Sequence, residues 1–412
     1  MKNLQKNFLI AGITTLSILT PLYIFTLIEL LSRPRNFEIQ RIERNNRLKI
    51  EFPEKIRLAK KGFMPNFIPK KTRKFFIDNK FYPVGTLPYT KTSYCNEGYG
   101  VVSYKSDRFG LRNSDENWDL LNSSDTTYFV GDSYVAGACV NDEFTFPKVY
   151  EEISSDNVIN LGSSGNTPYE YIAVLRQIVS PIIKTNNQNK KIVLVFYDND
   201  NKPFNEKIEK QAFQSEEIAI ISKDQSIQPK ETYVKLLKKV IKENYPNNKI
   251  AIINKYKEEQ EELKDKLNTY NFKNNFPYQF FTLVPLRIRI NSLLNINQNN
   301  ANKCIGGRDL CDLANSPSVK AIKTLKTICN QKDSCSPFVV YIPNSAYWRN
   351  NPLSSRYFKH IKDAARIHKI TFIDSSKVID KNSKNDYAPS GPHLSKEGYQ
   401  KLARFLNKEL NY

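Results

Sequence analysis

The sequence predicts an α/β fold built on a parallel sheet. From residue 126 onward, short β-rich runs alternate with helical patterns, and this alternation favours parallel strands. The run Lys191 to Tyr197 (K-I-V-L-V-F-Y) is apolar after its first residue, which is typical of a strand buried on both faces. A chain of 412 residues fits one large α/β domain with insertions as well as it fits two domains.

Ahead of this domain, Phe8 to Ile28 is an uncharged run long enough to cross a bilayer as a helix. Lys2 and Lys6 would also suit a cleaved signal peptide. However, the apolar run is long for one, and no small-residue cleavage site follows it. We therefore expect residues 1–32 to form an N-terminal transmembrane helix that anchors the chain.

Residues 33–125 are expected to form a basic juxtamembrane tether followed by an irregular N-terminal extension. The chain has a net charge of +20, and residues 33–80 supply about half of that excess. Such a run suits either anionic lipid headgroups or a solvated tether. Basic residues directly after the span predict a cytoplasmic main domain by the positive-inside rule, whereas the cysteine content argues for export.

Six cysteines include two close pairs, Cys304 with Cys311 and Cys329 with Cys335. Neither has the double C-x-x-C spacing of a zinc site. In an exported chain all six would form disulfides, with Cys95 and Cys139 as the remaining pair, although fifteen pairings are open to six cysteines. We expect no metal and no cofactor.

The elements of the α/β domain follow in order along the chain. The pattern predicts strands at 126–130, 158–161, 191–197, 337–342 and 370–373, and a polar segment follows each of them. It predicts helices at 168–183, 354–368 and 395–410. Residues 202–336 interrupt the alternation and are expected to be a long insertion or helical cap.

A serine follows the first strand in Gly131-Asp132-Ser133, at the carboxyl edge of the sheet where open α/β sheets bind ligands. A serine nucleophile needs a base and donors for the oxyanion. Of three histidines, His360 and His368 lie among basic residues on a helix, and we expect them on a solvated face. His393 instead lies in a Gly/Pro loop before the last helix, which makes it the candidate base.

The candidate oxyanion donors also follow strands. Gly165 lies in the turn after the second strand and Asn199 directly after the third. Each alone is an ordinary turn residue. Together with the N–H group of Ser133 they would surround one point at the strand ends.

Taken together, these blocks resemble the SGNH hydrolases, also called the GDSL-type esterase/lipase superfamily, over about 126–201 and 337–412. The similar blocks are Gly131-Asp132-Ser133, Asn160-Leu161-Gly162-Ser163-Ser164-Gly165-Asn166-Thr167, Asn199-Asp200 and His393-Leu394-Ser395-Lys396-Glu397-Gly398-Tyr399. The segment from Gly137 to Pro147 looks like the one after the nucleophile in membrane-anchored bacterial members.

The resemblance implies a three-layer α/β/α flavodoxin-like domain over 126–412, with the insertion at 202–336. It implies Ser133 and His393 as catalytic residues and Ser133, Gly165 and Asn199 as the oxyanion hole. The family usually has an acid three residues before the histidine, and here that position is Ser390. Asp386 could replace that acid, and Asp374 or Asp200 could serve equally well.

The leading hypothesis is a membrane-anchored serine esterase that removes ester groups, O-acetyl groups above all, from an extracytoplasmic glycan. An O-acetyltransferase acting on envelope polysaccharide and a non-catalytic glycan-binding or assembly protein are the alternatives. The expected partners are an ester-bearing carbohydrate and the membrane, and no nucleic acid. The expected place is the bacterial cytoplasmic membrane, crossed once, with the main domain outside the cytoplasm.

Overall fold

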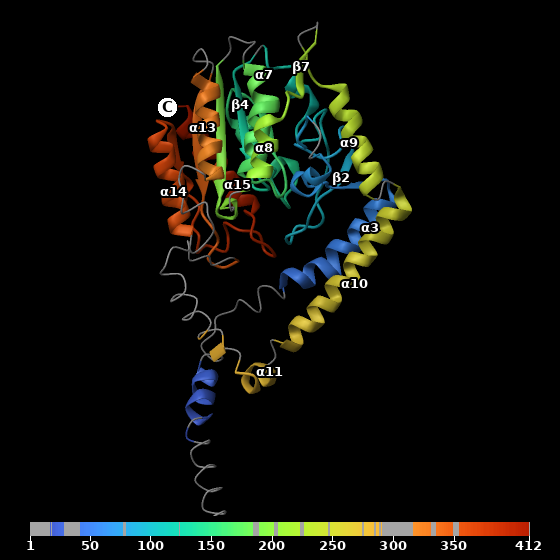
Figure 1. Ribbon diagram of the computed structural model, residues 1–412, viewed down its shortest axis with the longest axis vertical. Helices are drawn as coiled ribbons and strands as arrows, with labels where there is room; N and C mark the ends of the chain where they lie inside the picture. The colour runs from blue at the N-terminus through green and yellow to red at the C-terminus, as the bar shows by residue number, and fades with distance from the viewer. Residues whose placement is uncertain are drawn as a thin grey trace, which may run out of the picture. The chain divides into compact units, whose positions relative to one another are not determined.

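A computed structural model describes residues 17, 19–28, 42–76, 80–122, 124–183, 189–201, 205–222, 226–245, 248–273, 276–283, 286–287, 290, 316–330, 335–348 and 354–411. Its centre is a five-stranded sheet in the order β10-β9-β6-β4-β5, with every pair parallel (Figure 1). The strands are β4 (Thr126–Gly131), β5 (Asn157–Gly162), β6 (Lys190–Tyr197), β9 (Ser336–Ile342) and β10 (Thr371–Asp374). The predicted parallel sheet is thus confirmed.

Counted in chain order, the sheet reads 2-1-3-4-5, the flavodoxin-like order of doubly wound sheets. Alternate residues of β6 explain the layers, because Ile192 and Leu194 join one buried core while Val193 and Val195 join the other. The strands are therefore buried on both faces, as their continuous apolar composition predicts.

Helices cover both faces of the sheet. Core residues of α5 and α15 pack on one face, and those of α6, α8, α9, α13 and α14 lie in the core on the other. Their bounds are α5 (Phe146–Ile153), α6 (Pro168–Val174), α8 (Glu206–Gln214), α9 (Glu231–Asn244), α13 (Pro317–Asn330), α14 (Ser354–Ile367) and α15 (Lys396–Leu410). A π-helical turn, Leu175–Val179, joins α6 to α7 (Ser180–Ile183).

Helix starts follow their capping residues. Thr167 and Glu170 form a capping box at the start of α6, and Pro168 occupies its first turn. Ser395 caps α15 by accepting a hydrogen bond from the Gly398 main-chain N–H at 2.9 Å.

The expectation for His360 was wrong. Its side chain on α14 is only 7% exposed, and its Nε2 lies 2.8 Å from Ser316 Oγ. Burial lowers the pKa of His360 because the charged imidazole is poorly solvated there. The basic neighbours in sequence lie on other faces of the helix.

Within the range expected to be an insertion, α13 occupies the helix layer against α6 and links β6 to β9. The other described elements of that range are α8 and α9, the hairpin of β7 (Ala219–Ile221) and β8 (Ile227–Pro229), α10 (Lys249–Lys273) and α11 (Phe276–Phe281). The added material therefore precedes the crossover helix.

The N-terminal extension shares the core of the α/β domain. Its three-stranded sheet consists of β1 (Met64–Pro65), β2 (Lys91–Ser93) and β3 (Ser103–Lys105). Helix α3 (Phe52–Lys60) precedes this sheet, and α4 (Pro69–Thr72) lies between β1 and β2. Phe109 and Trp118 lie in the same buried cluster as Tyr128 and Val130 of β4. The extension thus packs directly on the sheet.

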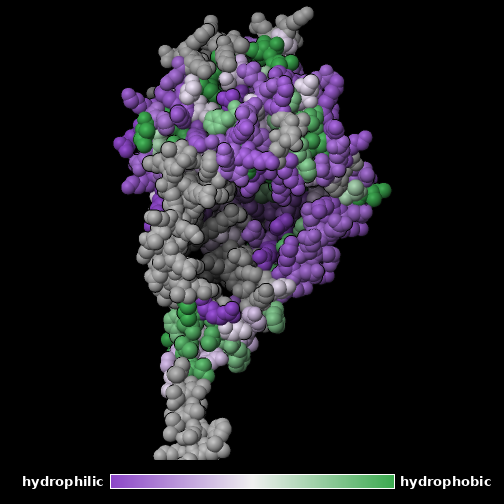
Figure 2. Space-filling view, in the orientation of Figure 1, coloured by the Kyte–Doolittle hydropathy of each residue, from purple (hydrophilic) through white to green (hydrophobic). Residues whose placement is uncertain are grey.

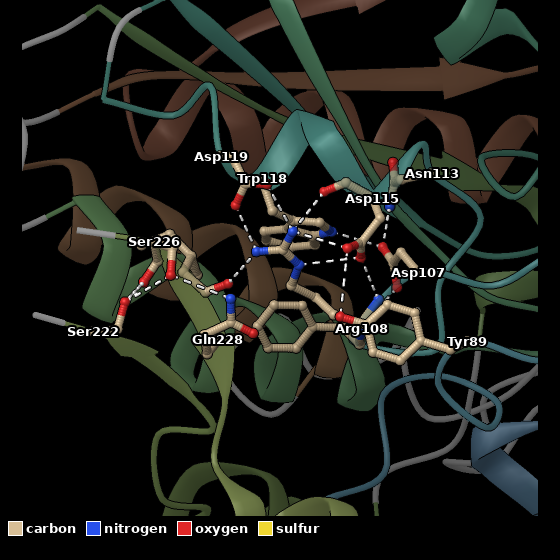
Figure 3. A network of polar contacts seen from close by, with 12 residues as sticks. Tyr89, Asp107, Arg108, Asn113, Asp115, Trp118, Asp119, Ser222, Ser226 and Gln228 are labelled. Atoms are coloured by element: carbon tan, nitrogen blue, oxygen red, sulfur yellow. Dashed lines mark hydrogen bonds and ion pairs between the residues drawn. The ribbon is translucent and has the colours of Figure 1, made fainter. Parts of the chain in front are cut away.

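A network of polar contacts fixes the segment between β3 and β4 (Figure 3). The Arg108 guanidinium donates to the carboxylates of Asp115 and Asp119 at 2.9 and 2.7 Å. Asp107 accepts hydrogen bonds from Trp118 Nε1 and Asn113 Nδ2, both at 2.8 Å. Burial raises the pKa of Asp107 to about 6 despite these donors.

The chain divides into two compact units, Asn46–Glu258 with Gly306–Tyr412, and Met1–Asn45 with Glu259–Ile305. In the unit that contains residues 1–45, apolar residues gather on the helical segment 19–28, where Ile24 is 52% exposed. The rest of the described surface in Figure 2 is mainly hydrophilic. No helix in the described residues has both the length and the apolar character needed to span a membrane. Residues 8–16 and 18 of the predicted span lie outside the described residues.

Candidate active site

The turn after β4 presents Ser133 at the carboxyl edge of the sheet. A side chain at Gly131 would lie 2.3 Å from Val135 Cγ2, so any larger residue there would displace Val135. The carboxylate of Asp132 accepts the Tyr134 main-chain N–H at 2.9 Å, which closes the turn. Ser133 itself is 8% exposed.

His393 lies beside this serine, as the sequence predicts. Its Nε2 is 2.8 Å from Ser133 Oγ, although the two residues are 260 positions apart. The loop that carries it is closed by a hydrogen bond from the Ala388 N–H to the His393 carbonyl, at 2.8 Å. Tyr134 stabilises the same loop by donating to the Pro392 carbonyl at 2.7 Å.

The group behind the imidazole is Glu97, from the N-terminal extension. Its Oε1 lies 2.7 Å from His393 Nδ1, and its Oε2 accepts the main-chain N–H of His393 at 3.0 Å. A carboxylate can only accept hydrogen bonds, so Nδ1 carries the proton. Nε2 is then left with a lone pair facing the Ser133 hydroxyl, the arrangement of a Ser-His-acid triad.

The loop that carries Glu97 is shaped by its neighbours. The Asn96 side-chain oxygen accepts hydrogen bonds from the N–H groups of Gly98 and Gly100, and both glycines have positive φ. The Glu97 carbonyl accepts the Ser390 N–H at 2.9 Å, which ties this loop to the histidine loop. A side chain at Gly391 would lie 1.9 Å from Glu97 Cδ, so glycine there makes room for the carboxylate.

The structure does not bring Asp386 to the imidazole. One of its carboxylate oxygens accepts the Asp380 N–H at 2.8 Å, and the other lies 2.6 Å from Lys401 Nζ. Asp386 therefore holds the histidine loop to α15. Of the other acids considered, Asp200 accepts from Tyr171, and Asp374 caps the turn that follows β10.

The predicted oxyanion residues follow two strands adjacent to β4. Gly165 follows β5 and Asn199 follows β6, and β4 pairs with both strands. Gly165 has φ +70° and is exposed, while Asn199 is partly exposed in a short 3₁₀ turn. Among the described residues, no hydrogen bond occupies the main-chain N–H of Ser133 or Gly165. Both groups remain available as donors at this edge.

The extension also contacts the Gly165 turn. The Tyr94 hydroxyl lies 2.5 Å from Ser164 Oγ, and a side chain at Gly165 would lie 3.0 Å from Ile68 Cγ2. Burial raises the pKa of Tyr94 to about 12, so the phenol stays neutral and can donate. Residues before 126 thus shape two parts of the site, the acid and the glycine turn.

Two of the expected disulfides are present in the described residues, Cys95–Cys139 and Cys329–Cys335. Cys304 and Cys311 lie outside the described residues. Glu97, Cys139 and His393 each offer a ligand-type atom within 4.8 Å of the others. However, Cys139 is bonded to Cys95, and a disulfide sulfur is not the thiolate that binds metals.

The sequence reasoning missed Glu97, which lies in an irregular segment 296 positions before His393. A usable signal was present, because Glu97 follows Cys95 by two residues and Cys139 follows Ser133 by six. Pairing those cysteines places an acid close to the nucleophile. We expected this cysteine pair from the sequence but did not use it to bring Glu97 to the serine.

No protein-family model and no curated protein matches the chain. Solved structures that match it include a protein assigned to the lipolytic G-D-S-L family from Desulfitobacterium hafniense DCB-2, at 11% identity and a TM-score of 0.31, covering 69% of this chain and 98% of that one. Another, from Veillonella parvula DSM 2008 and of the same family, has 11% identity, a TM-score of 0.34 and coverage of 70% and 99%. A third, assigned to the SGNH hydrolases, comes from Slackia heliotrinireducens, with 10% identity, a TM-score of 0.34 and coverage of 70% and 100%.

These three structures are named for the superfamily that the sequence blocks resemble. At such identities and TM-scores the matches carry no argument about activity or substrate. The chemistry of this chain is therefore derived from its own geometry, a serine hydroxyl, an imidazole and a carboxylate joined by hydrogen bonds at the carboxyl edge of a parallel sheet.

Proposed function

We propose that this protein is a serine ester hydrolase of the SGNH type, with Ser133, His393 and Glu97 as its catalytic triad. The observation that carries the proposal is the continuous hydrogen-bond chain from Ser133 Oγ through His393 to Glu97, with both distances below 3 Å. An orienting acid and a base within reach of the hydroxyl are what activate a serine nucleophile.

In the proposed reaction, Ser133 Oγ attacks the carbonyl carbon of the ester while His393 Nε2 takes the hydroxyl proton. The N–H groups of Ser133 and Gly165 and the Asn199 amide stabilise the negative charge that develops on the carbonyl oxygen. The protonated imidazole then gives its proton to the leaving alcohol. In the second half of the reaction, His393 Nε2 takes a proton from water as the water attacks the acyl carbonyl. The imidazole then returns that proton to Ser133 Oγ, and the carboxylic acid is released.

We infer that the substrates are ester groups, O-acetyl groups above all, on a glycan outside the cytoplasm. Two disulfides support an oxidising compartment, since such bonds are rare in the cytosol. The uncharged run Phe8 to Ile28 supports attachment to the membrane by a single N-terminal helix.

The alternative of a non-catalytic binding protein depended on the missing acid at Ser390. Glu97 supplies a carboxylate from another part of the chain, so that support disappears. An O-acetyltransferase would use the same triad with a sugar hydroxyl in place of water. The acceptor distinguishes the two reactions.

The test is hydrolysis of an aryl acetate by the purified protein and its Ser133→Ala variant. We expect the variant to lose at least about 10³-fold in kcat/KM with an unchanged melting temperature. Equal turnover by both proteins would overturn the proposal. An acetylated glycan with and without an unesterified sugar acceptor then separates acetate release from acetyl transfer.

A further inference from the structure

The Cys95–Cys139 disulfide lies close to the proposed catalytic acid and base. Cys139 Sγ, a nitrogen of His393 and a carboxylate oxygen of Glu97 all lie within 4.8 Å of one another. Cys139 is 2% exposed, so this contact is in the interior of the protein. The disulfide thus forms part of the wall around the Glu97–His393 pair.

The same bond joins the segment of the acid to the segment of the nucleophile. Cys95 precedes Glu97 by two residues, and Cys139 follows Ser133 by six. Their Cα atoms are 4.9 Å apart. Two parts of the triad that belong to different regions of the fold are therefore covalently linked at the site itself.

The nucleophile side of this link is held firmly. The buried Arg112 guanidinium donates to the main-chain oxygens of Ala136, Gly137 and Val140 at 3.2, 2.7 and 2.8 Å. The segment between Ser133 and Cys139 also closes on itself, since the Ala138 N–H donates to the Ser133 carbonyl at 2.9 Å. Cys139 is accordingly a fixed point relative to Ser133.

The acid side has no regular secondary structure of its own. Residues 94–102 form a short loop in which Gly98 and Gly100 are exposed and have positive φ. At its base the Tyr94 N–H donates to the Val102 carbonyl and the Val102 N–H to the Cys95 carbonyl, at 2.8 and 3.0 Å. Beyond Cys95 the chain is held by the hydrogen bonds of Asn96 and by those of Glu97 with Ser390 and His393. A displacement of about 1 Å in an orienting group can cost on the order of 10²-fold in rate. A covalent bond two residues from Glu97 limits such displacement.

We propose that the Cys95–Cys139 disulfide is a positioning element of the active site, which sets the Glu97 carboxylate against His393 Nδ1. Cys95 and Cys139 touch no reacting atom in this scheme and act through Glu97. The inference rests on the proposed function, and it predicts an enzyme whose turnover depends on the oxidised state of this one bond.

The first test compares two pairs of substitutions. In the Cys95→Ala/Cys139→Ala protein we expect kcat on an aryl acetate to fall about 10- to 100-fold with KM within about threefold, because orientation of the base is lost and the substrate surface is kept. The acidic limb of the pH–rate profile should move to lower pH, since the protonated imidazole loses its carboxylate partner. Unchanged kcat and pH profile would overturn the proposal.

The matched control is Cys329→Ala/Cys335→Ala. This second disulfide precedes β9, at the amino edge of the sheet opposite Ser133. Its removal costs stability as any disulfide does, but we expect kcat to change by less than about threefold at a temperature where the protein is folded. An equal loss of kcat in both pairs would mean that disulfides act here only through stability, and the proposal would be wrong.

The second test asks whether the disulfide acts through Glu97. In a Glu97→Gln background, removal of Cys95 and Cys139 should lower kcat/KM by less than about threefold further, since the group being positioned is already lost. If the fold losses in kcat/KM from Glu97→Gln and from removal of the two cysteines multiply in the combined variant, the disulfide does not act through Glu97. If Ser133→Ala is as active as the wild type, the proposed function itself fails, which is a different outcome from an active enzyme that tolerates loss of the disulfide.

Reduction of the folded protein avoids any failure of the variants to fold. In a background with Cys304, Cys311, Cys329 and Cys335 all replaced by alanine, a water-soluble phosphine and water convert the remaining disulfide to two thiols and the phosphine oxide. We expect activity to fall as thiol appears at Cys95, whose side chain is partly exposed, and to return on reoxidation. Full activity with both thiols free would contradict the proposal.

Discussion

Glu97 and Asp386 are both buried carboxylates at the loop that carries His393, yet they bind different partners. Glu97 is 8% exposed and holds the imidazole and main chain of His393. Asp386 is 1% exposed and holds the Asp380 N–H and the Lys401 ammonium. Nearness in sequence to the histidine therefore does not decide which acid serves it. The direction of approach does, because only Glu97 faces Nδ1.

The difference also separates two tasks of the same chemical group. Asp386 belongs to the loop and keeps its shape, since its carbonyl also accepts the Ser395 N–H at the start of α15. Glu97 comes from the N-terminal extension and orients an imidazole that the loop has already placed. Changes at the two positions should accordingly separate turnover from stability.

The largest expected effect follows from Glu97→Gln. The neutral amide cannot stabilise the protonated imidazole, and its NH₂ group would face the His393 N–H, so kcat/KM for an aryl acetate should fall about 10³- to 10⁴-fold. The free energy of unfolding should fall by no more than about 2 kcal/mol, the cost of one His393 N–H that loses its acceptor. A loss below tenfold would show that Glu97 is not the acid of the triad.

A smaller effect is expected from Gly391→Ala. The backbone of Gly391 is not left-handed, so alanine is compatible with it, but the new methyl group would lie 1.9 Å from Glu97 Cδ. Displacing the carboxylate should lower kcat about 10²-fold while KM stays within about threefold. In a Glu97→Ala protein the same substitution should have no further effect on kcat, which is the control.

Asp386→Ala should have the smallest effect on turnover. Loss of the carboxylate leaves the Asp380 N–H without its acceptor, so the free energy of unfolding measured with urea should fall by about 2 kcal/mol. Turnover per folded molecule should stay within about fivefold of the wild type. If Asp386→Ala lowers kcat as much as Glu97→Gln does, the two acids do not divide their tasks as described.

The site also shows which features local patterns can specify. Ser133, Gly165 and Asn199 follow predicted strands, and parallel strands bring their carboxyl ends to one edge whatever the intervening chain does. His393 was found by elimination among three histidines and by its place before the last helix. His360 shows the limit, because the residues beside it in sequence are basic while its own helix face packs on Ser316.

The sequence by itself predicted the parallel sheet and placed the candidate nucleophile, base and oxyanion donors at its carboxyl edge, because strand patterns and turn residues are local signals. The tertiary structure alone decided the acid. Glu97 lies in a loop without periodicity, and its contact with His393 spans 296 positions. Such a contact depends on how the extension packs against the nucleophile segment, through the Cys95–Cys139 disulfide and the space left by Gly391. No local pattern encodes that packing, because it arises only when the two segments meet.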